Sequence, residues 1–156
     1  MKSKAFLTLF VLLWVGSAAC NKAVAQNIEI DLSSEGLQEF PLNSIDSGLV
    51  SIDLRKNEII YWPEALSGLP QLRELRLSRN PLQWPDTLIG FSALRYLDLW
   101  DTDISRVPSF VVGFDNLEEL DLRETYLDER NRAALEAVFP GVEIHLTERC
   151  ICRPKP

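Results

Sequence analysis

A nine-residue pattern that returns at a fixed period decides the fold of this chain. Residues Leu72–Asn80 read LRELRLSRN, and the same pattern returns as LRYLDLWDT over Leu94–Thr102 and as LEELDLRET over Leu117–Thr125. Successive copies begin 22 or 23 residues apart. Self-similarity at such a period indicates a repeat protein, in which each unit buries its apolar face only by stacking on its neighbours.

The second half of each unit repeats in the same register. Aligned on their leucines, the units start near Asn27, Leu49, Leu72, Leu94 and Leu117. The recurring later positions are Trp62, Trp84 and Val107 before a proline, then Leu66, Leu88 and Val111, then Gly68, Gly90 and Gly113, then Leu69, Phe91 and Phe114. We call the equivalent positions of successive repeats a column. Trp62 and Trp84 share their column with Phe40 and Val107, so we interpret it as a packing column rather than an aromatic cage for a ligand.

Taken together, the two motifs resemble leucine-rich repeats of the short subclass whose return segment reads L-P-x-x-L-x-x-L. The resemblance covers Ile28 to Leu146, and the first unit departs from it by carrying Glu35 where the others have Asn or Thr. It implies an α/β solenoid with a curved parallel sheet on its concave face. It also implies the general activity of binding a protein or peptide.

The alternation of side chains along each strand predicts which motif positions point into the core and which point outward. Positions 4 and 6 of the motif should point into the core and positions 3, 5 and 7 outward, because side chains alternate across a strand. The inward residues are then Ile52, Leu54, Leu75, Leu77, Leu97, Leu99, Leu120 and Leu122. Asn57 and Asn80 follow the strand at a bend, where an amide satisfies backbone groups of adjacent turns. Thr102 and Thr125 replace them with a hydroxyl.

The last repeat needs a cap, since its core edge would otherwise be exposed. Asp128 is the predicted N-cap of a helix from about Glu129 to Phe139, which Pro140 and Gly141 end. Residues Val142–Leu146 should then form a closing strand, so that the cap is a helix followed by a strand.

The first residues predict an export signal rather than a membrane anchor. Lys2 and Lys4 precede an apolar run over Ala5–Val15, which is shorter than the roughly 20 residues that span a bilayer. Two cleavage positions compete. The stretch SAAC ending at Cys20 resembles a bacterial lipobox, with lipidation of Cys20, and its distance from the apolar run favours it; an A-x-A stretch ending at Ala25 would instead release a soluble periplasmic or secreted chain.

Charge excludes one class of partner. Loss of the two lysines of the signal leaves 14 basic residues against 23 acidic ones, a net charge of about −9. Such a surface repels phosphate backbones, so no nucleic acid is expected as a partner. We expect a membrane contact through the lipid on Cys20 if that residue is lipidated.

The tail contains the pair Cys150 and Cys152. In an exported chain we expect a disulfide, either between the two or to another chain. Two thiols and the one histidine, His145, do not supply the four ligands of a structural zinc site, so no metal and no cofactor is expected.

An enzyme is not expected either. The chain has one histidine, no nucleophile-elbow pattern and no glycine-rich phosphate loop. Asp98 and Asp121 fall in one outward column, where their ordinary interpretation is a solvated acidic face beside Arg76 and Arg123. The spacing of Asp98, Asp101 and Asp103 does not match a calcium loop.

The outward positions predict where a ligand binds. Tyr96 and Trp100 are outward aromatic residues on the middle strand, and residues of this type dominate binding hot spots. The candidate ligand-binding residues are Arg76, Tyr96, Asp98, Trp100, Asp121 and Arg123. We therefore expect residues 1–25 to be an export signal and linker, residues 26–146 to be a repeat domain that binds a protein or peptide in the cell envelope, and residues 147–156 to be a tail. The alternative is a structural lipoprotein packed permanently in an envelope assembly.

Overall fold

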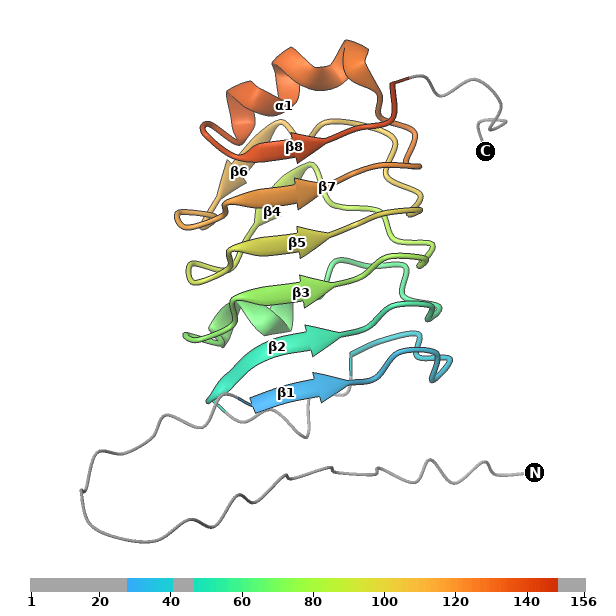
Figure 1. The fold of residues 1–156 in the computed structure, drawn as a ribbon, viewed down its shortest axis with the longest axis vertical. Helices are drawn as coiled ribbons and strands as arrows, with labels where there is room; N and C mark the ends of the chain where they lie inside the picture. Colours follow the sequence, from blue (N-terminus) through green and yellow to red (C-terminus); the bar gives the residue numbers. More distant parts are fainter. Residues whose placement is uncertain (1–27, 41–46, 149–156) are drawn as a thin grey trace, which may run out of the picture.

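Each copy of the nine-residue pattern contributes one short strand to a single parallel sheet. The computed structural model describes residues 28–40 and 47–148, so the predictions for Cys20, Cys150 and Cys152 fall outside the described residues. The strands are β1 (Ile28–Asp31), β2 (Leu49–Asp53), β3 (Glu74–Arg76), β5 (Tyr96–Asp98), β7 (Glu119–Asp121) and β8 (Glu143–His145). They form a six-stranded sheet in the order β1-β2-β3-β5-β7-β8, with the strands stacked one above another along the solenoid (Figure 1).

The register stacks equivalent residues of successive repeats. Leu75 pairs with Ile52 on one side and with Leu97 on the other, and the column continues through Leu120 and Ile144. All five side chains are buried, as are the leucines of the second inward column. Each buried leucine contributes roughly 1.5–3 kcal/mol relative to an exposed one. The predicted inward columns are confirmed.

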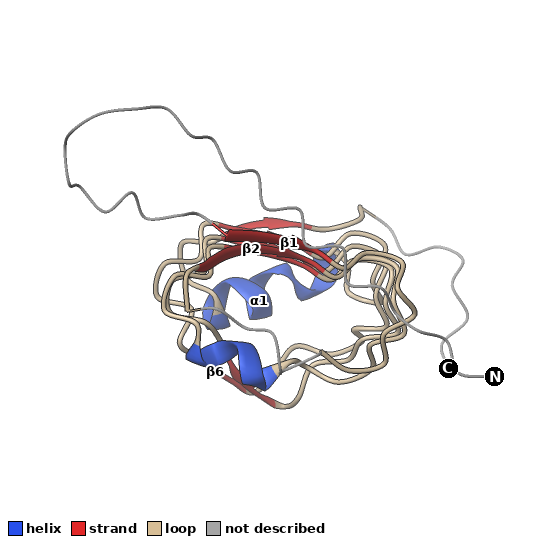
Figure 2. Cartoon of the chain, turned by 90° about the horizontal axis from the view of Figure 1, so that it is seen from below, coloured by secondary structure: helices blue, strands red, loops and turns tan. Residues whose placement is uncertain are grey.

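The return segments form the opposite side of the solenoid (Figure 2). They contain the 3-10 helix η2 (Glu64–Gly68) and two strands, β4 (Thr87–Ile89) and β6 (Phe110–Val112), which pair with each other in a second parallel sheet. The sequence analysis did not predict this small sheet.

The tryptophan column is part of the core, as predicted. Trp62 and Trp84 are 6% and 3% exposed, and their indole N–H groups donate to the carbonyl oxygens of Ile89 and Arg106. Aromatic rings continue the packing toward the C-terminal end: the Trp62 and Phe91 rings are 5.5 Å apart, and those of Phe114 and Phe139 are 5.6 Å apart. Because both indoles are buried and their N–H groups are bonded within the chain, they belong to the scaffold.

The asparagine column links one turn to the next. The side-chain amide of Asn80 donates to the carbonyl oxygens of Leu54 and Leu77, and its oxygen accepts from the N–H of Ile59. Asn57 makes the equivalent bonds one repeat earlier. Thr102 also bonds to the carbonyl of its own strand, but its short hydroxyl makes no bond to the adjacent turn. The scaffold role predicted for the asparagines is confirmed.

The corner before this column has a left-handed backbone in every repeat. Ser34, Lys56, Arg79, Asp101 and Glu124 have φ between 55° and 62°, although none is glycine. Such a conformation costs roughly 1–2 kcal/mol for an L-residue. It persists because the N–H groups of these residues bond to the following turn, as from Lys56 to the Ser78 carbonyl and from Arg79 to the Trp100 carbonyl.

A helical segment and a last strand cap the C-terminal end. Asp128 accepts from the N–H of Arg130, with Asn131 reaching back in a capping box, and starts the 3-10 helix η3 (Glu129–Asn131), which continues as α1 (Arg132–Val138). The side chains of Leu135 and Phe139 are buried. The predicted cap is thus present, with its helix split in two and its strand trimmed to Glu143–His145. Within the described residues, the helices are all too short and too polar to cross a bilayer.

Candidate binding site on the concave face

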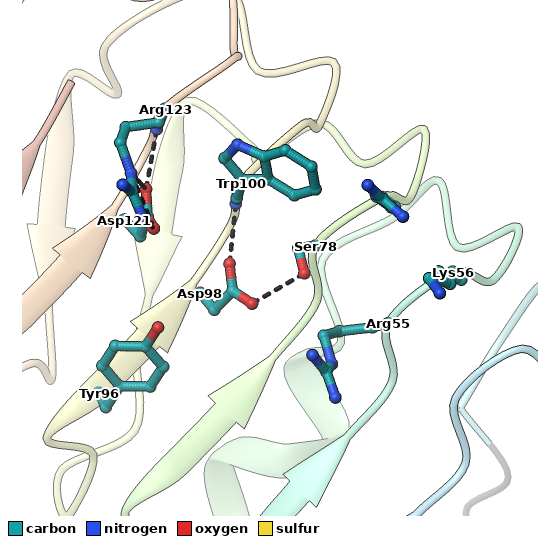
Figure 3. Close-up of a pocket in the computed structure, with 9 residues that line it drawn as sticks. Arg55, Lys56, Ser78, Tyr96, Asp98, Trp100, Asp121 and Arg123 are labelled. Carbon is teal, nitrogen blue, oxygen red and sulfur yellow. Dashed lines mark hydrogen bonds and ion pairs between the residues drawn. The ribbon is translucent and has the colours of Figure 1, made fainter. Parts of the chain in front are cut away.

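The exposed face of the large sheet is hollowed near the carboxyl ends of β2, β3, β5 and β7. We call this depression the concave hollow; its volume is about 380 Å³ (Figure 3). It is lined by Arg55, Lys56, Ser78, Arg79, Tyr96, Asp98, Trp100, Asp121 and Arg123. Four repeats contribute to it, because parallel strands in register bring equivalent positions side by side.

Five of the six predicted ligand-binding residues line this hollow. The sixth, Arg76, lies outside it and forms an ion pair with Glu74 of its own strand. Sequence reasoning missed Arg55, Lys56, Ser78 and Arg79. Arg55 and Ser78 share position 7 of the motif with Trp100, and Lys56 and Arg79 share position 8, so comparison along these two columns would have found them.

The interpretation of Asp98 and Asp121 as a solvated acidic face is wrong. Asp98 is 8% exposed and Asp121 is 4% exposed. The physical reason is that each short side chain folds back to accept from the backbone N–H two residues later, which belongs to Trp100 in one strand and to Arg123 in the other.

Two strands pair the position-5 aspartate with an arginine at position 7. At the end of β2, Arg55 donates from Nε to Oδ1 of Asp53 at 2.9 Å and from Nη2 to Oδ2 at 2.5 Å. In β7, Arg123 binds Asp121 in the same way, with contacts at 3.0 Å and 2.6 Å. These fork-shaped ion pairs neutralise each carboxylate within its own strand.

Asp98 lacks such an arginine, because Trp100 occupies the position-7 place in its strand. Its carboxylate accepts from the Ser78 hydroxyl at 2.8 Å and from the Trp100 N–H at 3.0 Å. Within residues 28–40 and 47–148, no basic side chain lies within 4 Å of it. Asp98 is therefore a buried carboxylate in the hollow that accepts hydrogen bonds but forms no ion pair, with the Arg55 charge acting on it from beyond contact distance.

The two environments shift the carboxyl pKa values in opposite directions. Burial acts to raise the pKa of Asp53, but the hydrogen bonds from Arg55 outweigh it, and the pKa lies below its ordinary value. Burial also raises the pKa of Asp98; there, the bonds from Trp100 and Ser78 do not offset it, and the nearby charge of Asp121 adds to the rise. The folded protein thus holds the Asp98 charge at a cost.

Aromatic side chains stand on two sides of Asp98 (Figure 3). Tyr96 and Trp100 are both partly exposed. Burial, together with the charges of Asp98 and Asp121, raises the pKa of the Tyr96 hydroxyl, so the hydroxyl stays protonated near neutral pH and can donate. The Arg79 guanidinium lies 4.6 Å from the centre of the Trp100 ring and covers part of it.

The rim of the hollow is basic. Arg55 and Arg123 are neutralised by their own aspartates. Lys56 and Arg79 are exposed corner residues and form no ion pair with other described residues. The same corner column continues with Asp101 and Glu124, so its charge changes sign along the solenoid.

The described residues contain neither a cluster of three or more His, Cys, Asp or Glu side chains suited to a metal ion nor a buried polar side-chain atom without a partner. The histidine, His145, lies 3.0 Å from Glu119 at the edge of the sheet, through its Nε2 and the carboxylate Oε1. It therefore pairs with a carboxylate rather than with a hydroxyl or thiol nucleophile.

The architecture and the repeated contacts define a leucine-rich-repeat solenoid. Among solved structures, the chain is similar to a leucine-rich-repeat protein of Leptospira interrogans, with a TM-score of 0.50 and 20% identity over 65% of this chain and 28% of that one. This likeness shows the fold alone.

Among curated proteins, the chain is similar to podocan-like protein 1 of Mus musculus, with 35% identity over 99 residues. The match covers 60% of this chain, which spans 17% of the length of the mouse protein. No family model matches the chain.

Proposed function

We propose that this protein is a non-enzymatic module that binds a protein or peptide in the concave hollow. One observation carries the proposal: a rigid sheet presents two partly exposed aromatic side chains, Tyr96 and Trp100, around the buried carboxylate of Asp98. The similarity to leucine-rich-repeat proteins supports it at the level of fold.

The geometry suits binding because little has to be ordered when a partner arrives. Hydrogen bonds between successive strands hold the backbone of the hollow, and hydrogen bonds to Ser78 and Trp100 hold the Asp98 side chain. Preorganised groups lose less conformational entropy on association. Tyrosine and tryptophan are enriched among interface hot spots, the few residues whose truncation costs about 2 kcal/mol or more.

The proposal is tested by capture of the partner with the purified exported protein and with two double variants. Tyr96→Ala with Trp100→Ala removes the aromatic walls of the hollow. The matched control, Phe110→Ala with Val112→Ala, removes two exposed apolar side chains from β6 on the opposite side. We expect quantitative mass spectrometry to show at least tenfold loss of the partner with the first variant and no loss with the second. Loss with the control alone would contradict the proposal.

We propose further that the module is exported and anchored by a lipid on Cys20. The support comes from the sequence alone, because these residues lie outside the described part of the chain. It is the stretch SAAC directly after the apolar run. The wild-type protein should incorporate labelled palmitate, and Cys20→Ala should not. A mature N-terminus at Gln26 would contradict the lipid anchor while leaving export intact.

A structural role in an envelope assembly is the second candidate. The outer face of β4 and β6 leaves Ile89, Phe110 and Val112 between 45% and 57% exposed. Apolar side chains in register on neighbouring strands form a surface that a permanent neighbour could cover. A monodisperse monomer in size-exclusion chromatography favours the exchangeable binder, and insolubility without a partner favours the assembly subunit.

A further inference from the structure

Two repeats show what an aspartate at position 5 of the motif binds when an arginine stands two residues later. Asp53 and Asp121 each hold a guanidinium in a forked ion pair, supplied by the arginine two residues later. Two strands lie between them: β3 has Arg76 at position 5, and β5 retains the aspartate as Asp98 but has Trp100 in place of the arginine. The carboxylate is present, but no guanidinium is paired with it as in β2 and β7.

The space beside this acceptor is open rather than filled by protein. Asp98 lines the concave hollow, and the Trp100 side chain engages the Arg79 guanidinium 4.6 Å from its ring. The hydroxyl of Ser78 and the N–H of Trp100 hold the two carboxylate oxygens in place, so that the carboxylate is fixed before any partner binds. The aromatic walls from Tyr96 and Trp100 provide faces that favour a cation.

We propose that the concave hollow receives a basic side chain of the partner, an arginine or a lysine, whose charge pairs with the Asp98 carboxylate. This proposal rests on the proposed function, because it names the chemistry of the partner at the same site. The incoming cation would complete, between two protein chains, the ion pair that β2 and β7 complete within their own strands.

The burial of the charges favours a cation over an anion. Asp98 is 8% exposed, whereas Lys56 and Arg79 are exposed at the corner, where water and salt screen their charges within about 8–10 Å. Arg55 and Arg123 are held in ion pairs with Asp53 and Asp121, which offset much of their charge, although the Arg55 charge still acts on Asp98. A carboxylate at the bottom of a hollow interacts more strongly with a ligand charge than a solvated ammonium at the rim.

The rise in the Asp98 pKa supports the same conclusion. The isolated protein holds this charge at a cost that a bound cation would remove.

The test uses three short peptides and the purified protein. The peptides are acetyl-Gly-Arg-Gly-amide, its citrulline analogue, which has the same shape without the charge, and its glutamate analogue. Binding is followed by the NMR signal of the Trp100 indole N–H, assigned with Trp100→Phe. In the unaltered protein, we expect the arginine peptide to shift this signal at millimolar concentration and to bind at least about tenfold more tightly than the citrulline peptide.

Two variants then connect the binding to Asp98. Asp98→Asn keeps an oxygen for the Trp100 N–H and an amide for the Ser78 oxygen, so the fold should remain, and the arginine peptide should lose at least about tenfold in affinity. Asp31→Asn changes an exposed aspartate in the same column on β1 and should leave the affinity within twofold.

Equal binding of the arginine and citrulline peptides, tighter binding of the glutamate peptide, or no shift at Trp100 with any peptide would each overturn the inference. The proposed function has a separate readout. If the peptides fail but the Tyr96 and Trp100 double variant still loses the natural partner, the hollow is the binding site and its preference for a basic side chain is refuted.

Discussion

Replacement of Leu97 by alanine tests the packing of the solenoid at its centre. Leu97 is fully buried and lies in register between Leu75 and Leu120 in the middle of the large sheet. Removal of a buried leucine side chain beyond its Cβ typically costs 2–5 kcal/mol, and the cost is largest where the surroundings cannot collapse into the cavity. The hydrogen-bonded strands on both sides of Leu97 cannot approach each other, so we expect about 3–5 kcal/mol.

For a domain of this size, each 1 kcal/mol lowers Tm by roughly 3–6 °C, so Leu97→Ala should melt at least about 10 °C below the unaltered protein. Val112→Ala on β6 is the control, because its side chain is 48% exposed and its truncation should cost less than about 1 kcal/mol. Circular dichroism melts and urea titrations measure both. A Tm for Leu97→Ala equal to that of Val112→Ala would refute the inward assignment of this column.

A harsher change at the same place should prevent folding. Leu97→Asp puts an unpaired carboxylate in the core, at a cost of several kcal/mol in a domain whose whole stability is about 5–15 kcal/mol. Arg95→Asp, at an exposed position two residues earlier, should fold. Equal stability of these two variants would show that the register is wrong.

Three further predictions concern the packing of one glycine and the acid titration of two aspartates. Gly90→Ala should lower Tm, because the new Cβ would lie 2.3 Å from the Phe114 ring. Gly68→Ala, at the equivalent position of the preceding repeat, has open space and should leave Tm nearly unchanged. A larger fall in Tm for Gly68→Ala than for Gly90→Ala would refute the packing between these repeats. Asp53 has a lowered pKa, so its charge stabilises the fold above its ordinary pKa of 3.8 and this contribution is lost as the pH falls further; Asp53→Asn should therefore be less stable than the unaltered protein at pH 7, with the difference shrinking toward pH 3. Asp98 has a raised pKa, so its contribution is present below pH 3.8 and lost as the pH rises; Asp98→Asn should be at least as stable as the unaltered protein at pH 7, and clear destabilisation there would contradict the cost assigned to this charge.

The sequence predicted the sheet and the packing columns because these follow from a strict period and from alternation along a strand. Leu75, Leu97 and Leu120 repeat at 22 and 23 residues and stack in register. The predicted cap was also found, since a capping aspartate followed by apolar residues at helical spacing is a local signal. The small sheet of β4 and β6 was missed, because three-residue strands are too short to show a period.

The candidate site was predicted in part. Alternation placed Tyr96 and Trp100 outward, but it cannot show that an outward side chain such as Asp98 folds back onto its own backbone and becomes buried. It also gave no reason to include Lys56 and Arg79, whose place at the rim depends on the left-handed backbone at the corner.

Photo-crosslinking from the hollow tests most directly whether the concave face binds the partner. The photoreactive residue p-benzoylphenylalanine is introduced in place of Tyr96 in the hollow, and separately in place of Phe110 on the outer face of β6, where the side chain is 57% exposed. Illumination in cells, followed by mass spectrometry, identifies the crosslinked chain. We predict a discrete crosslinked product from position 96 and none from position 110. A product from position 110 alone would contradict binding in the concave hollow.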